Sequence, residues 1–577
     1  MTDLLTNRKK KIGIAVLVLA VLAIVAMCYA SASSSLEFSV DPGFYDEPIT
    51  LKISGGAMGT IHYTLDGSEP TVDSELYTGG IELTDATELP NRASASTDSS
   101  TGFDTEMIEA YGSYECEFKV PDYNVDKIYL VRAAIFDAMG NKLQEIDGQY
   151  FLNFDEKSIY DDMAIVSITT DEANLWDPDI GIYTTGTTYQ QLKEAVLSGE
   201  ETLDDTTPWK FWAANYHNEG MDWERECQVA VYDESHELIM DTAAGLRMQG
   251  HGAAGENQKA FAIFARDEYS GSNTFPTDLT NSGYYQHRYI LTSGGQDQKY
   301  KINDYLVFGS VADMDVSTLD YRPCMMFLNG EFWGMYYISE CFNAEYVNGH
   351  YGVAKDNVII YKNRNVEEGT EEDRELYQEM YDFITTADMT DPANYEKAGE
   401  YIDIDSFVDY YVIMHYVARQ GDWPDSNEAV WRARTVESGN EYGDGRWRWM
   451  LFDLNGPELE LTNDRVDNYD EQVYSDMWRN MLTNDDFKAK YAERFWYLAN
   501  VDFEPELMNT KIDEYLTNYM DALMASNMRF YGQTYEEEIL NRIYIELKYY
   551  FTRRHDITPL IVAQFCGDQY NELYGGQ

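Results

Sequence analysis

The chain has 577 residues, enough for several folding units at roughly 150 residues each, so it is not a small domain stapled by disulfides. It carries 42 Lys plus Arg against 102 Asp plus Glu, a formal net charge of −60. Such a charge repels phosphate backbones and excludes nucleic acid as an expected partner. The 47 tyrosines predict surfaces built from rigid amphipathic rings.

Residues 1–34 have the pattern of an export signal. A basic cluster at 8–11 precedes an uncharged apolar stretch at 12–30, which nearly spans a bilayer core of about 30 Å. A signal anchor would give a single-pass cell-membrane protein with an extracellular domain. The alternative is a cleaved signal peptide, because Ala30 and Ala32 are small residues at the right offsets, and the protein would then be secreted.

Residues 36–154 alternate short apolar strands with turn residues, which is typical of a β-sandwich. The turn at 66–71 (Asp-Gly-Ser-Glu-Pro-Thr), followed by Leu76, Tyr77 and Ile81, resembles the C-terminal β-sandwich module of chitobiases and hexosaminidases. A Ser, Thr and Asp-rich insertion at 84–124 has no apolar period, so we expect a surface excursion there. The module's role stays open between contact with cell-wall carbohydrate, spacing, and a plain structural domain.

A second unit is expected over residues 160–577. It begins with a buried strand near 163–171, and a later strand leads into a glycine-rich segment that contains Gly250 and Gly252 and ends at Lys259. Such a loop lets the backbone approach phosphates, and the Lys259 ammonium at the next strand would lie against them. A hairpin with a solvated lysine is the alternative.

Asp422 and Asn427 stand five residues apart, and the hydrophobic run at 447–452 then leads into Asp453. This order is typical of a phosphoryl-transfer site, in which the first Asp takes the proton of an acceptor hydroxyl and the other two residues hold metal ions. Acidic and amide residues also fill ordinary turns, so a structural role stays open on spacing alone.

Several segments resemble, in the same order, the CotH family, named for spore coat protein H. They are 215–225, 245–259, 291–304, the strand pair at 327–340 and the late aspartate strand at 449–453. Members of that family are atypical protein kinases of secreted or surface proteins. The resemblance therefore implies an α+β kinase fold, ATP and Mg²⁺ or Mn²⁺ as cofactors, and a protein substrate at the cell surface.

Carried over by motif, the resemblance implies that Lys259 pairs with the nucleotide phosphates, that Asp422 orients the acceptor hydroxyl, and that Asn427, Asp453 and Asn455 lie at the metal. Glu340 ends a strand, where its carboxylate would steady Lys259 as a Lys–Glu pair does in ordinary kinases. A solvated carboxylate at the end of a strand is the alternative for Glu340.

Two departures from the family pattern bear on activity. The loop has Ala253, Ala254 and Gly255 where the family usually carries Ser and Arg, and Asn455 stands where a second Asp is common. Magnesium prefers anionic oxygen, so the amide weakens one metal position. A catalytically degenerate protein of the same fold, with a binding or assembly role that includes cell-wall carbohydrate, is the alternative function.

Other chemistries find no support in the sequence, which has no Gly-x-Ser-x-Gly elbow, no His-Glu-x-x-His helix and no paired-Cys zinc spacing.

After Tyr474 the apolar residues recur every three or four positions, which predicts helices at 477–482, 487–498, 508–524 and 537–554. The predicted fold class is α+β: an N-terminal β-sandwich, then an atypical protein-kinase-like domain with a helical C-terminal half.

Overall fold

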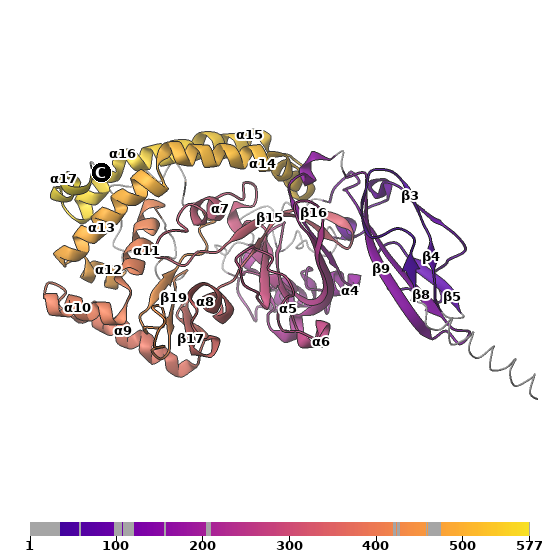
Figure 1. Cartoon of the computed structure of the whole chain (residues 1–577), viewed down its shortest axis with the longest axis horizontal. Coiled ribbons are helices and arrows are strands. Elements are labelled where there is room, and N and C mark those ends of the chain that lie inside the picture. The colour runs from indigo at the N-terminus through magenta and orange to yellow at the C-terminus, as the bar shows by residue number, and fades with distance from the viewer. Residues whose placement is uncertain are drawn as a thin grey trace, which may run out of the picture.

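The computed structural model describes residues 35–575, except for 57–58, 97–106, 108–119, 155–156, 204–208, 419–422, 424–426, 457–458 and 460–474. Along its long axis the molecule runs from a β-sandwich through a β-barrel to a second small sheet enclosed by helices (Figure 1). The predicted α+β class, with an N-terminal sandwich and a helical C-terminal half, is confirmed.

The N-terminal part combines a five-stranded sheet, in the order β2-β9-β8-β5-β6, with the antiparallel pairs β1–β4 and β3–β7. Alternate apolar residues of these strands, among them Leu51, Leu83, Val131 and Tyr150, form one buried core. The strands are Glu37–Phe38 (β1), Gly43–Tyr45 (β2), Ile49–Leu51 (β3), Ile53–Ser54 (β4), Thr60–Thr64 (β5), Glu75–Leu76 (β6), Ile81–Leu83 (β7), Tyr129–Phe136 (β8) and Lys142–Leu152 (β9).

The predicted insertion at 84–124 falls between β7 and β8, and much of it lies outside the described residues. Its described part is anchored to the barrel. The backbone N–H groups of Arg92 and Ser94 both donate to the buried Glu331 carboxylate. Residues 91–94 therefore belong to the contact between sandwich and barrel rather than to a solvated loop.

The barrel closes from seven strands in the order β10-β11-β12-β13-β14-β16-β15, with β10 and β15 parallel. Alternate residues such as Val166, Val229, Ile263 and Met326 fill its interior and are fully buried. The opposite residues of β13 and β14 therefore face outward. The strands are Ala164–Thr169 (β10), Arg225–Tyr232 (β11), Leu238–Gln249 (β12), Ala260–Phe264 (β13), Arg288–Thr292 (β14), Tyr321–Leu328 (β15) and Glu331–Ser339 (β16).

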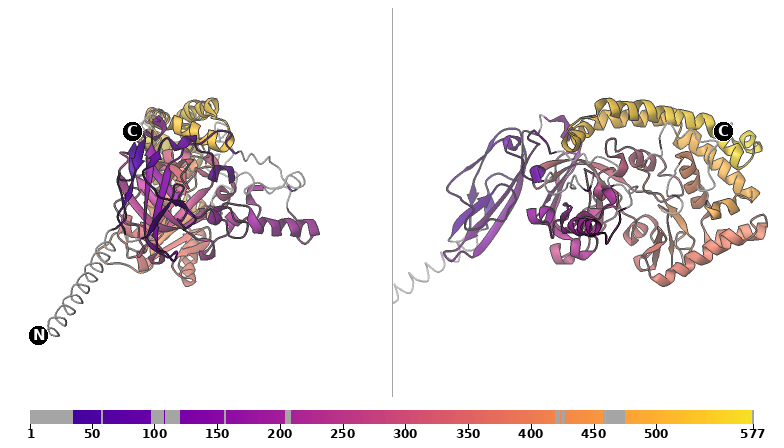
Figure 2. Two further views of the ribbon diagram at one scale, coloured as in Figure 1. Left: turned by 90° about the vertical axis from the view of Figure 1, so that its right-hand side faces the viewer. Right: turned by 180° about the vertical axis from the view of Figure 1, so that it is seen from behind.

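Four helices lie in the connections between the barrel strands. They are Glu172–Trp176 (α4), Gly186–Ser198 (α5), Asp267–Ser270 (α6) and Asn303–Phe308 (α7). Helix α5 projects from the body of the molecule (Figure 2, left). At its base, Trp212 and Tyr216 pack with Ala254 of the glycine-rich segment in one buried cluster. The projecting segment therefore supports that loop from behind.

A second sheet, in the order β18-β17-β19-β20, lies beyond the barrel. Its strands are Val358–Lys362 (β17), Asn365–Glu368 (β18), Ala429–Ala433 (β19) and Arg448–Met450 (β20), and helix α8 (Ala344–Tyr351) joins the barrel to it. The apolar residues of α8, β17 and β19 form one buried cluster, so α8 covers a face of this sheet.

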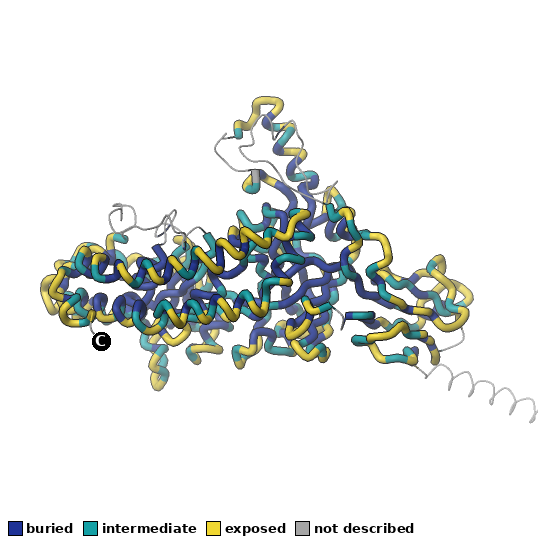
Figure 3. Tube along the Cα trace, turned by 90° about the horizontal axis from the view of Figure 1, so that it is seen from above, coloured by how far each residue is buried: buried dark blue, intermediate teal, exposed yellow. Residues whose placement is uncertain are grey.

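The remaining helices lie around the second sheet and along the barrel, where Ser526 accepts from the Met335 N–H of β16 at 2.9 Å, and they confirm the predicted helical half. Side-chain caps fix several starts; Asp391 accepts from the Ala393 N–H and Asn484 from the Phe487 N–H. The helices are Arg374–Thr386 (α9), Pro392–Tyr401 (α10), Ile404–Tyr416 (α11), Asp476–Met481 (α12), Asp485–Tyr497 (α13), Pro505–Tyr531 (α14), Glu536–Ile539 (α15), Lys548–Phe565 (α16) and Gln569–Tyr574 (α17). Exposed and buried turns alternate along the long outer helices (Figure 3).

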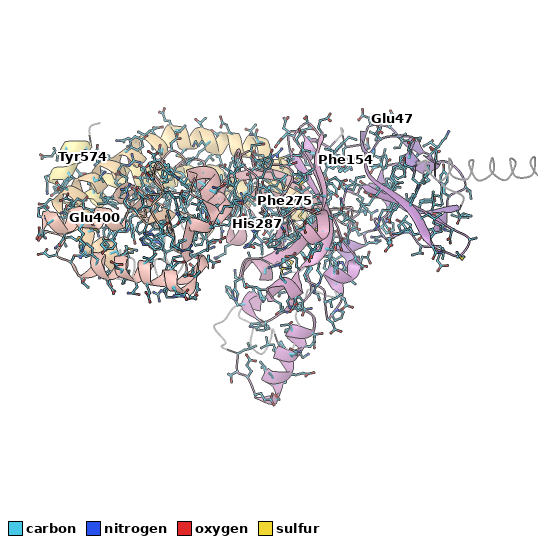
Figure 4. The ribbon with its side chains drawn as sticks, turned by 60° about the horizontal axis from the view of Figure 1, so that its bottom comes forward. Glu47, Phe154, Phe275, His287, Glu400 and Tyr574 are labelled. Atoms are coloured by element: carbon cyan, nitrogen blue, oxygen red, sulfur yellow. The ribbon has the colours of Figure 1, made fainter. Side chains whose placement is uncertain are left out.

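Sandwich and barrel share a core. Their backbones join where Ile128 N–H donates to Gly330 O at 2.9 Å and Phe332 N–H donates to Asp126 O at 2.8 Å. Phe154, which Figure 4 labels near this junction, packs with its ring centre 4.7 Å from that of Tyr160. Separating the two parts would expose these buried rings to water.

No helix among the described residues combines the length and the apolar composition needed to cross a membrane. The longest of them, α14, carries charged residues such as Lys511 and Asp521 along its course. The predicted signal segment, residues 1–34, lies outside the described residues. The finding that no described helix could cross a membrane contradicts the prediction of a single-pass cell-membrane protein.

Candidate functional site

A cavity of about 980 Å³ lies between the outer face of the barrel and the second sheet. The barrel contributes the loop 249–253 and the outward residues of β13 and β14, such as Ala260 and Ile290. The other side contributes Lys362 of β17 and the polar residues near Asp453. Segments more than 200 positions apart in sequence thus meet around one space.

The glycine-rich loop forms one edge of this cavity, and both predicted glycines, Gly250 and Gly252, line it. Gly250 has φ +83°, a left-handed conformation that favours glycine. A Cβ on Gly252 would come within 3.0 Å of the Phe211 ring, which also lines the cavity. At these two positions the loop therefore presents backbone to a ligand, while its neighbours Gln249 and His251 also line the cavity.

Lys259 does not line the cavity, contrary to the prediction. It is fully buried, and its ammonium donates to Ala254 O at 2.7 Å and to Glu256 O at 3.1 Å, with the Tyr216 ring centre 3.8 Å away. Side chains alternate along a strand, so when Ala260 faces the cavity, Lys259 points to the opposite side. The structure thus places this cation behind the loop, where it holds the loop's carbonyl groups.

Glu340, which directly follows β16, is also buried. Its carboxylate accepts from Tyr284 Oη and from the Asp320 N–H at 3.2 Å, and it lies 3.2 Å from His350 Nε2. Burial and the Glu340 charge together hold the pKa of Tyr284 well above its usual value. These contacts differ from the predicted role of steadying Lys259. The reason is again alternation, since Ser339 and Cys341 face the cavity and Glu340 faces away.

The predicted metal residues do come together. Asn427 Nδ2 donates to Asp453 Oδ2 at 2.7 Å, and Asn455 Nδ2 donates to Asp453 Oδ1 at 3.1 Å. Asn427 has φ +56° and Asp453 has φ +59°, left-handed conformations that cost most side chains roughly 1–3 kcal/mol and that cluster at functional sites. All three residues line the cavity.

Asp304, in the first turn of α7, is a fourth member that the sequence did not assign. Its Oδ1 accepts from the Leu454 N–H at 2.7 Å and its Oδ2 from Asn455 Nδ2 at 3.2 Å. Burial first, and the nearby Asp453 charge second, raise the pKa of Asp304 to about 7. The available signal was the Asn303-Asp304 pair inside the motif at 302–304, which carried the family resemblance but no role.

These residues fit a hard divalent cation. Two carboxylates and two amides supply oxygen ligands of the kind that Mg²⁺ and Mn²⁺ take. Beside them, Asn303 Oδ1 is buried without a hydrogen-bond partner among the described residues. The described part of the chain has no group of three or more His, Cys, Asp or Glu placed to hold a metal, so amide oxygens or ligand phosphates would complete the coordination.

The predicted catalytic residue, Asp422, lies outside the described residues, and its role stays a prediction. Trp423, which follows it, is buried and donates through Nε1 to Tyr410 Oη of helix α11 at 2.9 Å. Asn427, five positions after Asp422, lines the cavity.

Comparison with known families identifies two segments. The family model described as "CotH kinase protein" matches residues 246–557, and that described as "Chitobiase/beta-hexosaminidase C-terminal domain" matches residues 40–103. Both families are those that the sequence motifs resemble. None of the curated proteins matches the chain significantly.

Proposed function

The chain belongs to the family of CotH kinase proteins, and from this premise we propose that it transfers the γ-phosphoryl group of ATP to a protein hydroxyl, with Mg²⁺ or Mn²⁺ as the metal. The observation that carries the proposal is the cavity of about 980 Å³, which joins a glycine-rich loop to the pair Asn427 and Asp453. Phosphoryl transfer depends mainly on positioning and on neutralising phosphate charge, and those are the parts such a cleft provides.

In this proposal Asp453 and Asp304 supply the charged metal ligands. Asn427 and Asn455 present N–H groups to Asp453, and turning either amide over would present its oxygen instead. The metal, when bound, supplies charge neutralisation at the phosphates. Asp422 keeps its predicted role of orienting the acceptor hydroxyl, and the backbone at Gly250 and Gly252 lies along the nucleotide.

The test is incubation of the purified chain with labelled ATP and Mg²⁺ or Mn²⁺, followed by mapping of phosphorylated residues. Asp453→Asn is expected to lose metal-dependent nucleotide binding and to lower transfer by roughly a hundredfold or more. Asp521→Asn, an exposed position on α14, is the matched control and should behave as wild type. Absence of both nucleotide binding and transfer with every divalent metal would refute the proposal.

A catalytically degenerate protein of the same fold is the second candidate, and one observation favours it. Asn455 Nδ2 donates to both Asp453 and Asp304, so a neutral amide bridges the two carboxylates without a cation. Such a protein would transfer no phosphoryl group with any divalent metal, whether or not Mg²⁺ or ATP raises the midpoint of thermal unfolding by binding to the native state. Transfer from ATP to a mapped protein hydroxyl, lost in Asp453→Asn, would exclude this candidate.

A further inference from the structure

We propose that Arg288 and Lys362 form the phosphate-binding site of the cavity, the place expected for Lys259. The inference deepens the proposed function and rests on it for the natural ligand, a nucleoside triphosphate. The chemistry it claims is narrower and separately testable: a site for a di- or triphosphate anion.

The two cations reach the same space from different sheets. Arg288 begins β14 of the barrel, Lys362 ends β17 of the second sheet, and both line the cavity. Cys341, a third lining residue, lies beside Arg288, with its Sγ 3.8 Å from Arg288 O. Burial raises the pKa of its thiol to about 11, and the charges of Arg288 and Lys362 both oppose that rise. The two positive charges therefore lie near one another at the cavity wall.

Arg288 connects this site to the glycine-rich loop. Its Nη2 donates to the side chain of Gln249, the residue before Gly250, at 2.6 Å. Its Nε is buried and has no hydrogen-bond partner among the described residues. A guanidinium with a donor unused beside a polar cavity matches the fork geometry with which arginine binds phosphate oxygens.

The ammonium of Lys362 lies 4.4 Å from the centre of the Phe452 ring, another lining residue. No carboxylate of the described residues lies within 4.0 Å of it. Burial lowers the pKa of Lys362, and the Arg288 charge lowers it as well, whereas the charges of Glu367 and Asp453, which both line the cavity, raise it. A bound anion would offset the repulsion between these two cations.

The pair is unusual in this chain, which has 102 acidic residues against 42 basic ones. Several other half-buried arginines are neutralised by carboxylates, although Arg225 and Arg432 bind carbonyl groups and lie over rings instead. Arg247 and Arg266 share Glu224, and Arg434 pairs with Asp373. Two neighbouring cations that face a cavity without a carboxylate partner among the described residues therefore call for an exchangeable anion. The adjacent cluster around Asp453, which fits a divalent metal, adds the second requirement of a metal–polyphosphate ligand.

The experiment measures binding of inorganic triphosphate by calorimetry, with and without Mg²⁺, to the whole chain and its variants. Arg288→Gln and Lys362→Gln are each expected to weaken binding about tenfold or more, because each removes a charge-assisted contact. Lys397→Gln removes an exposed lysine on α10, so it is the matched control and should bind as wild type. Wild-type binding should also weaken as salt is added.

Thermal unfolding checks that each variant is folded. If Arg288→Gln does not fold, triphosphate binding by Lys362→Gln, at a half-buried position, tests the inference. Equal binding by the variants and the control would overturn the inference, as would a wild type that binds no triphosphate with any metal. Transfer from ATP is scored separately. If the variants lose triphosphate binding while the wild type transfers no phosphoryl group, this site stands and the kinase proposal falls. If the wild type transfers a phosphoryl group and the variants bind triphosphate normally, the kinase proposal stands and this phosphate site falls.

Discussion

Asn455 is a neutral amide that lies between the two carboxylates of the site. Its amide donates to Asp453 at 3.1 Å and to Asp304 at 3.2 Å, so it replaces repulsion between two carboxylates by two hydrogen bonds. Introducing a third carboxylate here would remove both bonds and add a negative charge. The same change would add an anionic ligand for Mg²⁺.

We therefore expect Asn455→Asp to lower the free energy of unfolding by about 1–3 kcal/mol in chelator, since buried acceptors lose their donor. Added Mg²⁺ or Mn²⁺ should raise its thermal midpoint more than that of wild type. Scanning calorimetry with and without metal checks both parts. A variant that is equally unstable under the two conditions would show that no metal binds between these residues.

His415 makes a pH prediction at the same scale. It is buried in α11, where burial first and the Arg554 charge second lower its pKa from 6.5 to about 3, and its Nδ1 lies 2.8 Å from Tyr491 Oη. The folded chain therefore keeps this imidazole neutral while the unfolded chain protonates it below about pH 6.5. The neutral His415 therefore contributes fully to the stability of the fold above about pH 6.5, and this contribution is lost as the pH falls toward 3.

Replacing His415 by Asn should reduce the pH dependence of unfolding by up to about 1.4 kcal/mol per pH unit between about pH 6 and 4. Denaturant unfolding of wild type and variant across that range measures the difference. An unchanged slope would mean that another group takes the proton.

Sequence spacing predicted the meeting of Asn427 and Asp453, because a family motif fixes both positions along the chain. It failed for Lys259 and Glu340, since a shift of one position on a strand reverses the face on which a side chain lies. Asp304 was missed because its partners stand about 150 positions away, and the motif at 302–304 indicated the family but not this contact.

At the scale of elements, the glycine-rich loop is held by a buried cation. Lys259 binds the carbonyl groups of Ala254 and Glu256 from the side that faces away from the cavity. We predict that Lys259→Met lowers the free energy of unfolding by about 2–4 kcal/mol, because two buried carbonyl groups lose a charged donor.

Hydrogen exchange over residues 249–256 should become faster in that variant, and thermal unfolding gives the stability change. The contrary result would be normal stability and exchange together with lost ATP binding. That result would mean that Lys259 acts on the nucleotide, as the family resemblance first implied.

The elements themselves were predictable where one face is buried. The spacing after Tyr474 gave α12, α13 and α14, which pack one side against the core. Helix α11 gave no such signal, because every residue from Ser406 to Tyr416 is buried and the apolar pattern has no polar face. The closure of the barrel was also beyond sequence reasoning, since it depends on pairings such as β14 with β16.

At the scale of the molecule, the shared core between sandwich and barrel predicts one unfolding transition. Phe151 of β9 lies with its ring centre 6.0 Å from that of Phe327 of β15, and backbone bonds cross the same junction. Calorimetry should show a single peak for wild type. Phe151→Ala should lower its midpoint by several degrees, as a core truncation of about 3–5 kcal/mol does.

Thr50→Ala, on the exposed face of β3, is the matched control for that experiment and should leave the midpoint nearly unchanged. Two well-separated peaks in wild type would show that the sandwich folds and unfolds by itself, and that the junction contributes little.

The cation pair of the cavity belongs to a molecule of formal charge −60, and this affects how a nucleotide arrives. A polyanion approaching from solution is repelled until it comes within roughly a Debye length, about 10 Å, of Arg288 and Lys362. Salt then has opposite effects on the two steps: it speeds the encounter and loosens the bound complex. Free ATP is the form most strongly repelled, whereas ATP already complexed with a divalent ion carries less charge. We therefore expect metal and nucleotide to enter together, which suits a site with few carboxylates of its own.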